Sequence, residues 1–259
     1  MTKYNVFASH FKDFQDNYVI IGGTACEIVM TDLGFSFRST ADIDMIIVAE
    51  ELSIEFGKAF WQFINDGGYE SHKDNTGKNY YRFSKPSNKE EYPAMIELFC
   101  KKPIEDYRTG NKTFTPIHIS DDVKSLSAIV LNDTYADVLV DGKRLIEGLT
   151  VLAPEHLIIF KARAHIDLKS RKEDGEQVKT NDIMKHLKDI IRLLSILDID
   201  ESKEFVNKIS DEIRADLLLF LNEVDKKERS YINGLDVKDV GMNNPDEIIS
   251  QLKELFSLD

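Results

Sequence analysis

The chain has 259 residues, 42% hydrophobic and 31% charged, and a formal net charge of −13. These values are ordinary for a globular protein of one large domain or two modest ones. The acidic balance argues against broad, non-specific DNA binding. Apolar runs fall short of the roughly 20 residues that a membrane-spanning helix needs. The two cysteines lack metal-ligand spacing, so we expect reduced thiols, a cytoplasmic location and no membrane partner.

The first part of the chain predicts a helix, a strand, a glycine turn and a second helix. Aromatic residues at helical spacing predict the first helix over 4–16, and the apolar run 19–21 predicts the strand. Gly22 and Gly23 end this strand, and glycine lets a ligand approach the main chain closely. We expect Thr24 to cap the second helix, whose free N–H groups suit a phosphate.

Three carboxylates stand out among the predicted strands. Asp42 and Asp44 are spaced i, i+2 at the start of a strand, so both project from one face. Glu97 is embedded in the later apolar run 94–100. A buried carboxylate without a partner is costly, and a metal ion shared with the two aspartates would provide one. The alternative is that Glu97 is an exposed strand residue.

The rest of the chain changes from mixed to helical composition. A helix is predicted over 53–65, and short β-like runs are predicted at 79–84, 94–100, 116–119, 126–131 and 135–140. Beyond Pro154 the pattern predicts helices at 154–165, 181–197, 202–227 and 245–256. We therefore predict an α+β fold. A mixed β-sheet domain with flanking helices would span 1–150, and an α-helical domain that completes the active-site cleft would span 151–259.

The predicted chemistry follows from the three acids and the glycine turn. Carboxylates converging from two neighbouring strands suit Mg²⁺, or Mn²⁺, because hard cations prefer oxygen ligands. Two such ions can activate a hydroxyl and neutralise a leaving pyrophosphate. The main chain of the glycine turn would hold a triphosphate. The combination of turn, acid pair and third acid is much more specific than an Asp-x-Asp pair alone.

These motifs resemble a known signature. IGGTA, then RSTADIDMII, then MIELF are similar to the glycine turn, acid-x-acid strand and third acidic strand of the DNA polymerase β-like nucleotidyltransferase superfamily. The segment FRSTADID most resembles AbiEii-type toxins of abortive-infection and toxin–antitoxin systems. This likeness implies a nucleotidyltransferase fold and an NTP substrate such as ATP. It also implies a magnesium site at Asp42, Asp44 and Glu97, phosphate contacts from Gly22, Gly23 and Thr24, and a cognate antitoxin.

The resemblance extends more loosely into the helical half. It implies nucleotide binding by Lys161, Asp189 and Arg192, with Lys161 also catalytic. From the residues alone, Lys161 can instead be a packed helix residue with its charge in solvent. Arg38, before the acid pair, can cap a helix or form a salt bridge. We expect His186 to be a surface residue.

Three functional hypotheses follow. The first is an enzyme that moves NMP from an NTP to a hydroxyl of tRNA, protein or a small molecule such as an antibiotic, with the toxin likeness favouring a macromolecule. The second is a nucleotide-binding regulatory module without turnover. The third is a helical half that serves chiefly as an interaction surface, for example for an antitoxin.

Overall fold

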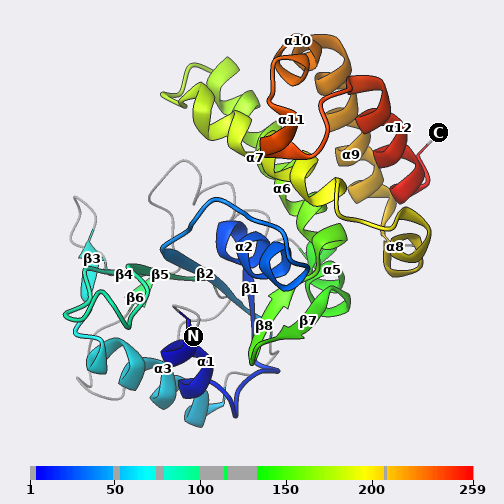
Figure 1. Ribbon diagram of the computed structural model, residues 1–259. Coiled ribbons are helices and arrows are strands. Elements are labelled where there is room, and N and C mark those ends of the chain that lie inside the picture. The colour runs from blue at the N-terminus through cyan, green and yellow to red at the C-terminus, as the bar shows by residue number, and fades with distance from the viewer. Residues whose placement is uncertain are drawn as a thin grey trace. The chain divides into compact units, whose positions relative to one another are not determined.

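The computed structural model describes residues 4–48, 53–73, 79–99, 114–115, 133–206 and 209–258. The chain divides into two compact units, which are shown in Figure 1. The first takes in Met1–Leu131 and Lys143–Leu152, and the second takes in Asn132–Gly142 and Ala153–Asp259. The β-like runs expected at 116–119 and 126–131 lie outside the described residues. Among the described helices, none is long and apolar enough to cross a membrane.

The first unit is built on a mixed sheet. The described strands follow the order β3-β4-β5-β2-β1-β8-β7, with β6 paired to β4. In the centre, β1 is antiparallel to β2 and parallel to β8, and β2 is parallel to β5. The bounds are β1 (Tyr18–Ile21), β2 (Asp42–Ile47), β3 (Glu70–Lys73), β4 (Asn79–Ser84), β5 (Met95–Phe99), β6 (Phe114–Thr115), β7 (Lys143–Ile146) and β8 (Leu149–Leu152).

Helices cover both faces of this sheet. Figure 1 shows α2 (Gly22–Asp32) on one face, with α1 (Asn5–His10) and α3 (Ile54–Asp66) on the other. Buried aromatic rings join α1 to α3, and Phe60 and Trp61 of α3 pack edge-on against Phe83 of β4. Phe83 is in register with Ile96 of β5, which is in register with Ile43 of β2. The face under α3 is therefore apolar, and alternation turns the acids of β2 and β5 to the opposite face.

Helix α1 is shorter than the expected 4–16. It ends at His10, and hydrogen bonds from Phe14 N to Phe11 O and from Asn17 N to Phe14 O form turns instead of further helix. Phe7 and Phe11 are buried and stack with ring centroids 4.6 Å apart. The spacing of the aromatic residues thus reflects their burial against α3. It does not require a continuous helix, because the chain leaves the helix after His10 and continues in tight turns.

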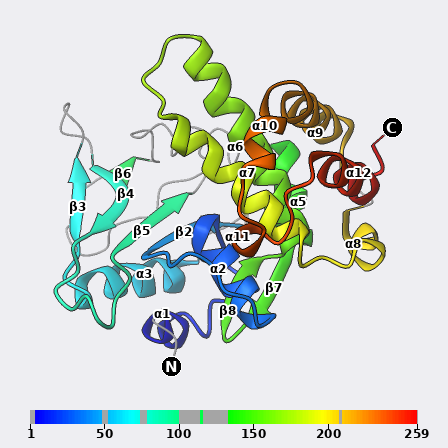
Figure 2. The same cartoon turned by 45° about the horizontal axis from the view of Figure 1, so that its top comes forward.

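The second unit is helical. Its longest members, α6 and α7, run side by side (Figures 1 and 2). Pro154 opens α6 at a position where its missing N–H costs nothing, and Ser210 and Asn244 cap α9 and α12. The bounds are α5 (Ala136–Asp141), α6 (Pro154–Glu173), α7 (Thr180–Leu194), α8 (Ile199–Val206), α9 (Asp211–Glu223), the π-helical segment η2 (Val224–Glu228), α10 (Arg229–Asn233), α11 (Val237–Val240) and α12 (Pro245–Phe256).

Two expectations about this half were wrong, and one was confirmed. The run 135–140 is helical in α5, because Val138 and Leu139 are both buried as neighbours on a helix and Tyr135 packs on Phe160. The long helix expected over 202–227 is divided into α8 and α9 by the new N-cap at Ser210. The predicted final helix coincides with α12.

The boundary between the units also differs from the single cut expected at 150. Strands β7 and β8 complete the sheet of the first unit, since β8 pairs with β1. The segment Asn132–Gly142 belongs to the helical unit. Tyr135 is the physical reason, because its hydroxyl donates to Asp216 of α9 at 2.6 Å.

Candidate functional site

Strand pairing brings two of the predicted acids together. Asp44 of β2 is directly in register with Glu97 of β5, and Asp42 is in register with Met95. Because β2 and β5 are neighbours, the carboxyl groups of Asp44 and Glu97 lie side by side on one face of the sheet, and Asp42 follows two residues earlier on the same face. The sequence expectation of acids converging from adjacent strands therefore matches the observed register.

Glu97 is buried with like charges around it. The residue is 5% exposed, so its alternative interpretation as an exposed strand residue is wrong. Burial, then the charge of Asp44, a hydrogen bond with Asp44 and the charge of Asp42 raise the pKa of Glu97 to about 8, although Arg82 lowers it. Glu97 therefore holds a proton at neutral pH unless another positive charge replaces it.

Arg82 on β4 flanks the acids from the other side. It is in register with Glu97, and its Nε lies 2.9 Å from Glu97 Oε1. This contact is an ion pair without hydrogen-bond geometry, because Oε1 is buried and accepts no hydrogen bond. Nε instead donates to Met95 Sδ at 3.2 Å. One guanidinium therefore offsets the negative charge of three carboxylates only in part.

Gly22 allows Asp44 to reach the start of α2. Its φ is +71°, a conformation that other residues rarely adopt, and an added Cβ would overlap Asp44 Oδ2. The Asp44 carboxylate thus lies against the first residue of α2. The partial positive charge at a helix N-terminus favours an ionised acid there. Both the backbone conformation and the space at position 22 therefore require glycine.

Arg38 lies over the next glycine. A Cβ added to Gly23 would be 3.1 Å from Arg38 Nη2 and 2.8 Å from Thr40 Cγ2. The Arg38 side chain is exposed, and its guanidinium also lies 5.4 Å from the centre of the Phe37 ring. The first turn of α2 therefore carries a cation above its free N–H groups, which is a suitable arrangement for a phosphate. The sequence signal for Arg38 was its place four residues before Asp42.

Thr24 does not cap α2 as expected. The helix begins at Gly22 with Ile21 as its N-cap, and that cap makes no side-chain hydrogen bond. Thr24 is the third residue of the helix, and its hydroxyl donates to the main-chain oxygen of Asp42 and lies 2.9 Å from Thr40 Oγ1. Thr24 thus anchors the first residue of β2 to α2, which is a positioning role that capping rules do not reveal.

A hydrogen-bond network that the sequence did not indicate surrounds this anchor. Glu27 Oε2 accepts from both the main-chain N and the hydroxyl of Thr40, at 2.9 and 2.7 Å. The buried hydroxyl of Tyr4 lies 3.0 Å from Glu27 Oε2 and 3.5 Å from Thr24 Oγ1. The network fixes the end of the connection between α2 and β2, and with it the position of the acid pair.

The donor set fits a hard divalent cation by its chemistry. Asp42, Asp44 and Glu97 supply carboxylate oxygens, the ligands that Mg²⁺ and Mn²⁺ prefer, and Glu97 Oε1 is a buried oxygen without a hydrogen bond. As the side chains stand, with a hydrogen bond between two of the acids, the described residues include no group of three or more His, Cys, Asp or Glu arranged to hold a metal.

The predicted nucleotide-binding residues of the second unit lie next to one another. Lys161 of α6 is 5% exposed, so its ammonium group does not reach solvent, and it donates to Asp189 Oδ2 of α7 at 2.8 Å. Arg192 Nη1 is 3.6 Å from Asp189 Oδ1, and its Nε donates to the main-chain oxygen of Asp239. Two cations thus converge on one buried carboxylate.

His186 differs from the expectation of a surface residue. Both of its ring nitrogens are buried and make no hydrogen bond. Burial, followed by the charges of Lys161 and Lys185, lowers the pKa of His186 well below its ordinary value. The imidazole is therefore neutral next to the lysine–aspartate pair. The surrounding lysines suggested a solvated face, but α7 turns this residue inward.

No protein-family model, curated protein or solved structure matches this chain. The resemblance to nucleotidyltransferases therefore rests on the sequence motifs alone.

Proposed function

We propose that this protein is a metal-dependent nucleotidyltransferase that moves NMP from an NTP to a hydroxyl acceptor. One observation carries the proposal. Glu97 and Asp44 are held together on one face of a sheet, at the N-terminus of α2, where burial and the charge of Asp44 raise the pKa of Glu97 to about 8. Excess buried negative charge beside a helix N-terminus is what a site for divalent cations and phosphates requires.

The residues have distinct proposed roles. Asp42, Asp44 and Glu97 would hold Mg²⁺ or Mn²⁺, which would supply charge neutralisation at the phosphates when bound. The N–H groups at Gly22 and Gly23, together with Arg38, would bind and orient the triphosphate. In the second unit, we propose Lys161, Asp189 and Arg192 for nucleotide binding, and Lys161 would then exchange its ion pair with Asp189 for a phosphate oxygen. Thr24 fixes the strand that carries the acids.

The acceptor is proposed from the motif likeness alone. The segment FRSTADID resembles AbiEii-type toxins, so tRNA or a protein is the preferred acceptor and a cognate antitoxin the preferred partner. A small-molecule acceptor stays as an alternative within the same chemistry.

The test is transfer of label from α-labelled NTPs with Mg²⁺ or Mn²⁺ to tRNA, protein or small-molecule hydroxyls. We expect pyrophosphate release and a labelled acceptor, reduced at least ~100-fold in Asp44→Asn, because charge stabilisation of this kind supplies about that much. Asp32→Asn is the matched control, since Asp32 ends α2 on the exposed surface. Absence of transfer with every NTP and acceptor would overturn the proposal.

A nucleotide-binding module without turnover is the second candidate, and the Arg82–Glu97 ion pair favours it. A guanidinium 2.9 Å from Glu97 Oε1 already occupies part of the space and charge that a cation would take. This candidate predicts that an NTP binds without pyrophosphate release. It also predicts that Asp44→Asn leaves the affinity for the NTP nearly unchanged.

A further inference from the structure

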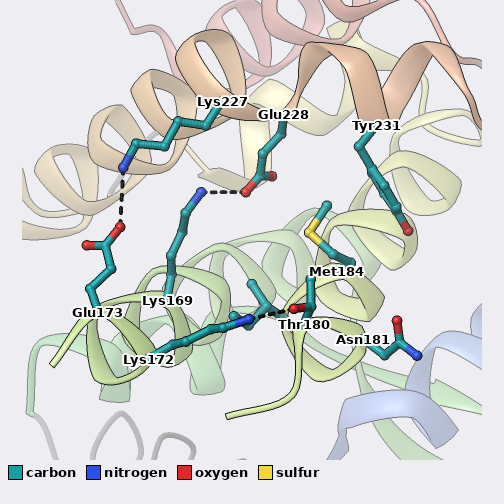
Figure 3. A pocket seen from close by; sticks show the side chains of 10 residues that line it. Lys169, Lys172, Glu173, Thr180, Asn181, Met184, Lys227, Glu228 and Tyr231 are labelled. Carbon is teal, nitrogen blue, oxygen red and sulfur yellow. Dashed lines mark hydrogen bonds and ion pairs between the residues drawn. The ribbon is translucent and has the colours of Figure 1, made fainter. Parts of the chain in front are cut away.

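A cavity of about 630 Å³ lies entirely within the second unit (Figure 3). It is bounded by the C-terminal turn of α6, the N-terminal turn of α7 and the segment from η2 to α10. A volume in this range is typical of sites for small molecules. None of the residues proposed above for nucleotidyl transfer lines it.

One wall of the cavity is apolar. Ile183 and Met184 of α7 are buried, and Tyr231 of α10, which also lines the cavity, is 36% exposed. Figure 3 shows Met184 and Tyr231 on the same side of the cavity. A flat ring would find an aromatic face and a polarisable thioether there, which are favourable partners for aromatic groups.

The lining also includes a buried carboxylate, Glu228, of which one oxygen accepts a hydrogen bond and the other accepts none. Glu228 is 5% exposed, and its Oε1 accepts from Lys169 Nζ at 2.7 Å and faces His165 Nε2 at 3.1 Å. Its Oε2 is also buried and has no hydrogen-bond partner. Burial alone would raise the pKa of Glu228, but His165 and Lys169 outweigh it and lower the pKa. The carboxylate is therefore ionised, and Oε2 requires a donor.

The backbone around Glu228 departs from an ordinary α-helix. The segment Val224–Glu228 is π-helical and joins α9 to α10. It leaves Lys227 exposed and turns Glu228 inward. Single π-helical turns interrupt helices mostly at functional positions, because they re-aim side chains at a cost to the hydrogen-bond ladder. The π-helical backbone and the Oε2 atom without a hydrogen bond are thus two independent observations about Glu228.

The rim is polar. Lys172 Nζ donates to the hydroxyl of Thr180, and Asn181 carries its amide beside it (Figure 3). These groups suit hydroxyl substituents on a ligand whose ring lies deeper. The described lining thus offers an apolar wall for a ring, a carboxylate oxygen for a donor, and a polar rim for substituents. Its two remaining charged residues, Lys227 and Glu173, pair with each other at 3.3 Å.

We propose that this cavity binds a small molecule whose flat heteroaromatic ring carries an amino group, with the ring against Tyr231 and Met184 and the amino group donating to Glu228 Oε2. The chemistry is that of a purine nucleoside such as adenosine. This site is separate from the proposed transfer site and does not depend on it.

The test is adenosine binding to the full chain by calorimetry, with EDTA present. Purine riboside, which lacks the amino group, is the matched ligand and should bind at least about tenfold more weakly. The Glu228→Gln variant should weaken adenosine about tenfold and remove the difference between the two ligands. Glu223→Gln is the matched control, because Glu223 pairs with the same Lys169 at 2.8 Å without lining the cavity, and it should bind adenosine normally.

A second variant keeps the test valid if Glu228→Gln fails to fold. Tyr231→Ala changes a partly exposed side chain and should weaken both nucleosides by a similar factor. Asp44→Asn should bind adenosine like the wild type, which separates this site from the proposed transfer site. No binding of adenosine, or binding that is unchanged in Glu228→Gln and Tyr231→Ala, would overturn the proposal.

Discussion

Each unit buries a glutamate among charged groups, and the two glutamates respond in opposite ways. In the sheet unit, burial and the neighbouring aspartates raise the pKa of Glu97 to about 8. In the helical unit, Lys169 and His165 more than offset the burial of Glu228, and its pKa falls. The two ring nitrogens of His165 lie 3.1 Å from the main-chain oxygen of Ile183 and 3.1 Å from Glu228 Oε1. Like charges accumulate in the first unit, whereas opposite charges are paired in the second.

The contrast distinguishes carboxylates that we expect to be neutralised by a bound cation from charged groups that are already paired within the protein. Placing acids side by side costs free energy of folding, and the cost is recovered only when a cation binds. A buried pair such as Lys161 and Asp189 satisfies itself, so its removal is felt in stability. Breaking one group in each unit therefore has different consequences.

The largest expected effect on stability comes from Lys161→Met. This change removes the ammonium group that lies 2.8 Å from Asp189, a carboxylate that is buried at 1% exposure. Breaking a buried ion pair by removing one partner costs roughly 3–5 kcal/mol, and urea unfolding would measure it. The double variant Lys161→Met with Asp189→Leu should recover most of the loss. The exposed Lys203, paired with Glu254, is the control, and Lys203→Met should change stability little. Equal losses for the two lysines would contradict the assignment of the buried pair.

Gly22→Ala is expected to affect stability less and activity more. A non-glycine residue at a φ of +71° costs about 1–2 kcal/mol. Gly34→Ala is a close control, because Gly34 has a φ of +82° and no atom within 4 Å of an added Cβ. Urea unfolding should give similar losses for both. Only Gly22→Ala displaces the Asp44 carboxylate, so nucleotidyl transfer should fall at least ~10-fold in that variant alone. Equal nucleotidyl transfer by the two variants would show that the position of the Asp44 carboxylate against α2 does not matter for the reaction.

The third expected effect is a slope of stability with pH in the absence of metal. The folded pKa of Glu97, about 8, exceeds the ordinary glutamate pKa of 4.5, so the folded state keeps a proton that the unfolded state loses. The free energy of unfolding should therefore fall as the pH rises from 5 to 8, by at most about 1.4 kcal/mol per unit. Glu97→Gln should remove this slope in urea titrations with EDTA.

The helical unit provides the comparison for that slope. The lowered pKa of Glu228 contributes stability that is present above the ordinary glutamate pKa and is lost only at more acidic pH. Glu228→Gln should therefore leave the slope between pH 5 and 8 unchanged. If the slope of the unfolding free energy with pH disappears in Glu228→Gln but remains in Glu97→Gln, the assignment of the raised pKa to Glu97 is contradicted.

The proximity of the acids was predictable because it depends on local rules. Alternation along a strand places Asp42 and Asp44 on one face, and an acid inside an apolar strand such as β5 needs a partner, for which a metal ion shared with other acids is one solution. The glycine turn and the α12 helix were visible for similar reasons, since glycine and the Asn244–Pro245 start act within a few residues. These features needed no knowledge of the tertiary fold.

Other features depended on long-range pairing that no local pattern encodes. Arg82 reaches Glu97 only because β4 pairs with β5. Arg38 lies over α2 because Glu27 and Thr40 fix a connection without regular structure. The inward turn of Glu228 follows from a π-helical segment, which shifts the helical period that sequence patterns assume. The segment 135–140 has a strand-like composition, but it forms the helix α5 because that conformation buries Val138 and Leu139 together.

The Thr24–Thr40–Glu27 network changes the meaning of the long interval between the glycine turn and the acid pair. Seventeen residues separate Thr24 from Asp42 in the chain, yet the hydroxyl of Thr24 bonds directly to the main chain of Asp42. The hydrogen bond thus fixes to α2 the end of the connection that leads into β2. The middle of the connection, around Gly34, consists of exposed residues. Loop length and acid position are therefore uncoupled. Residues can be gained or lost in that middle at small entropic cost, while β2 stays anchored to α2 through the Thr24–Asp42 hydrogen bond.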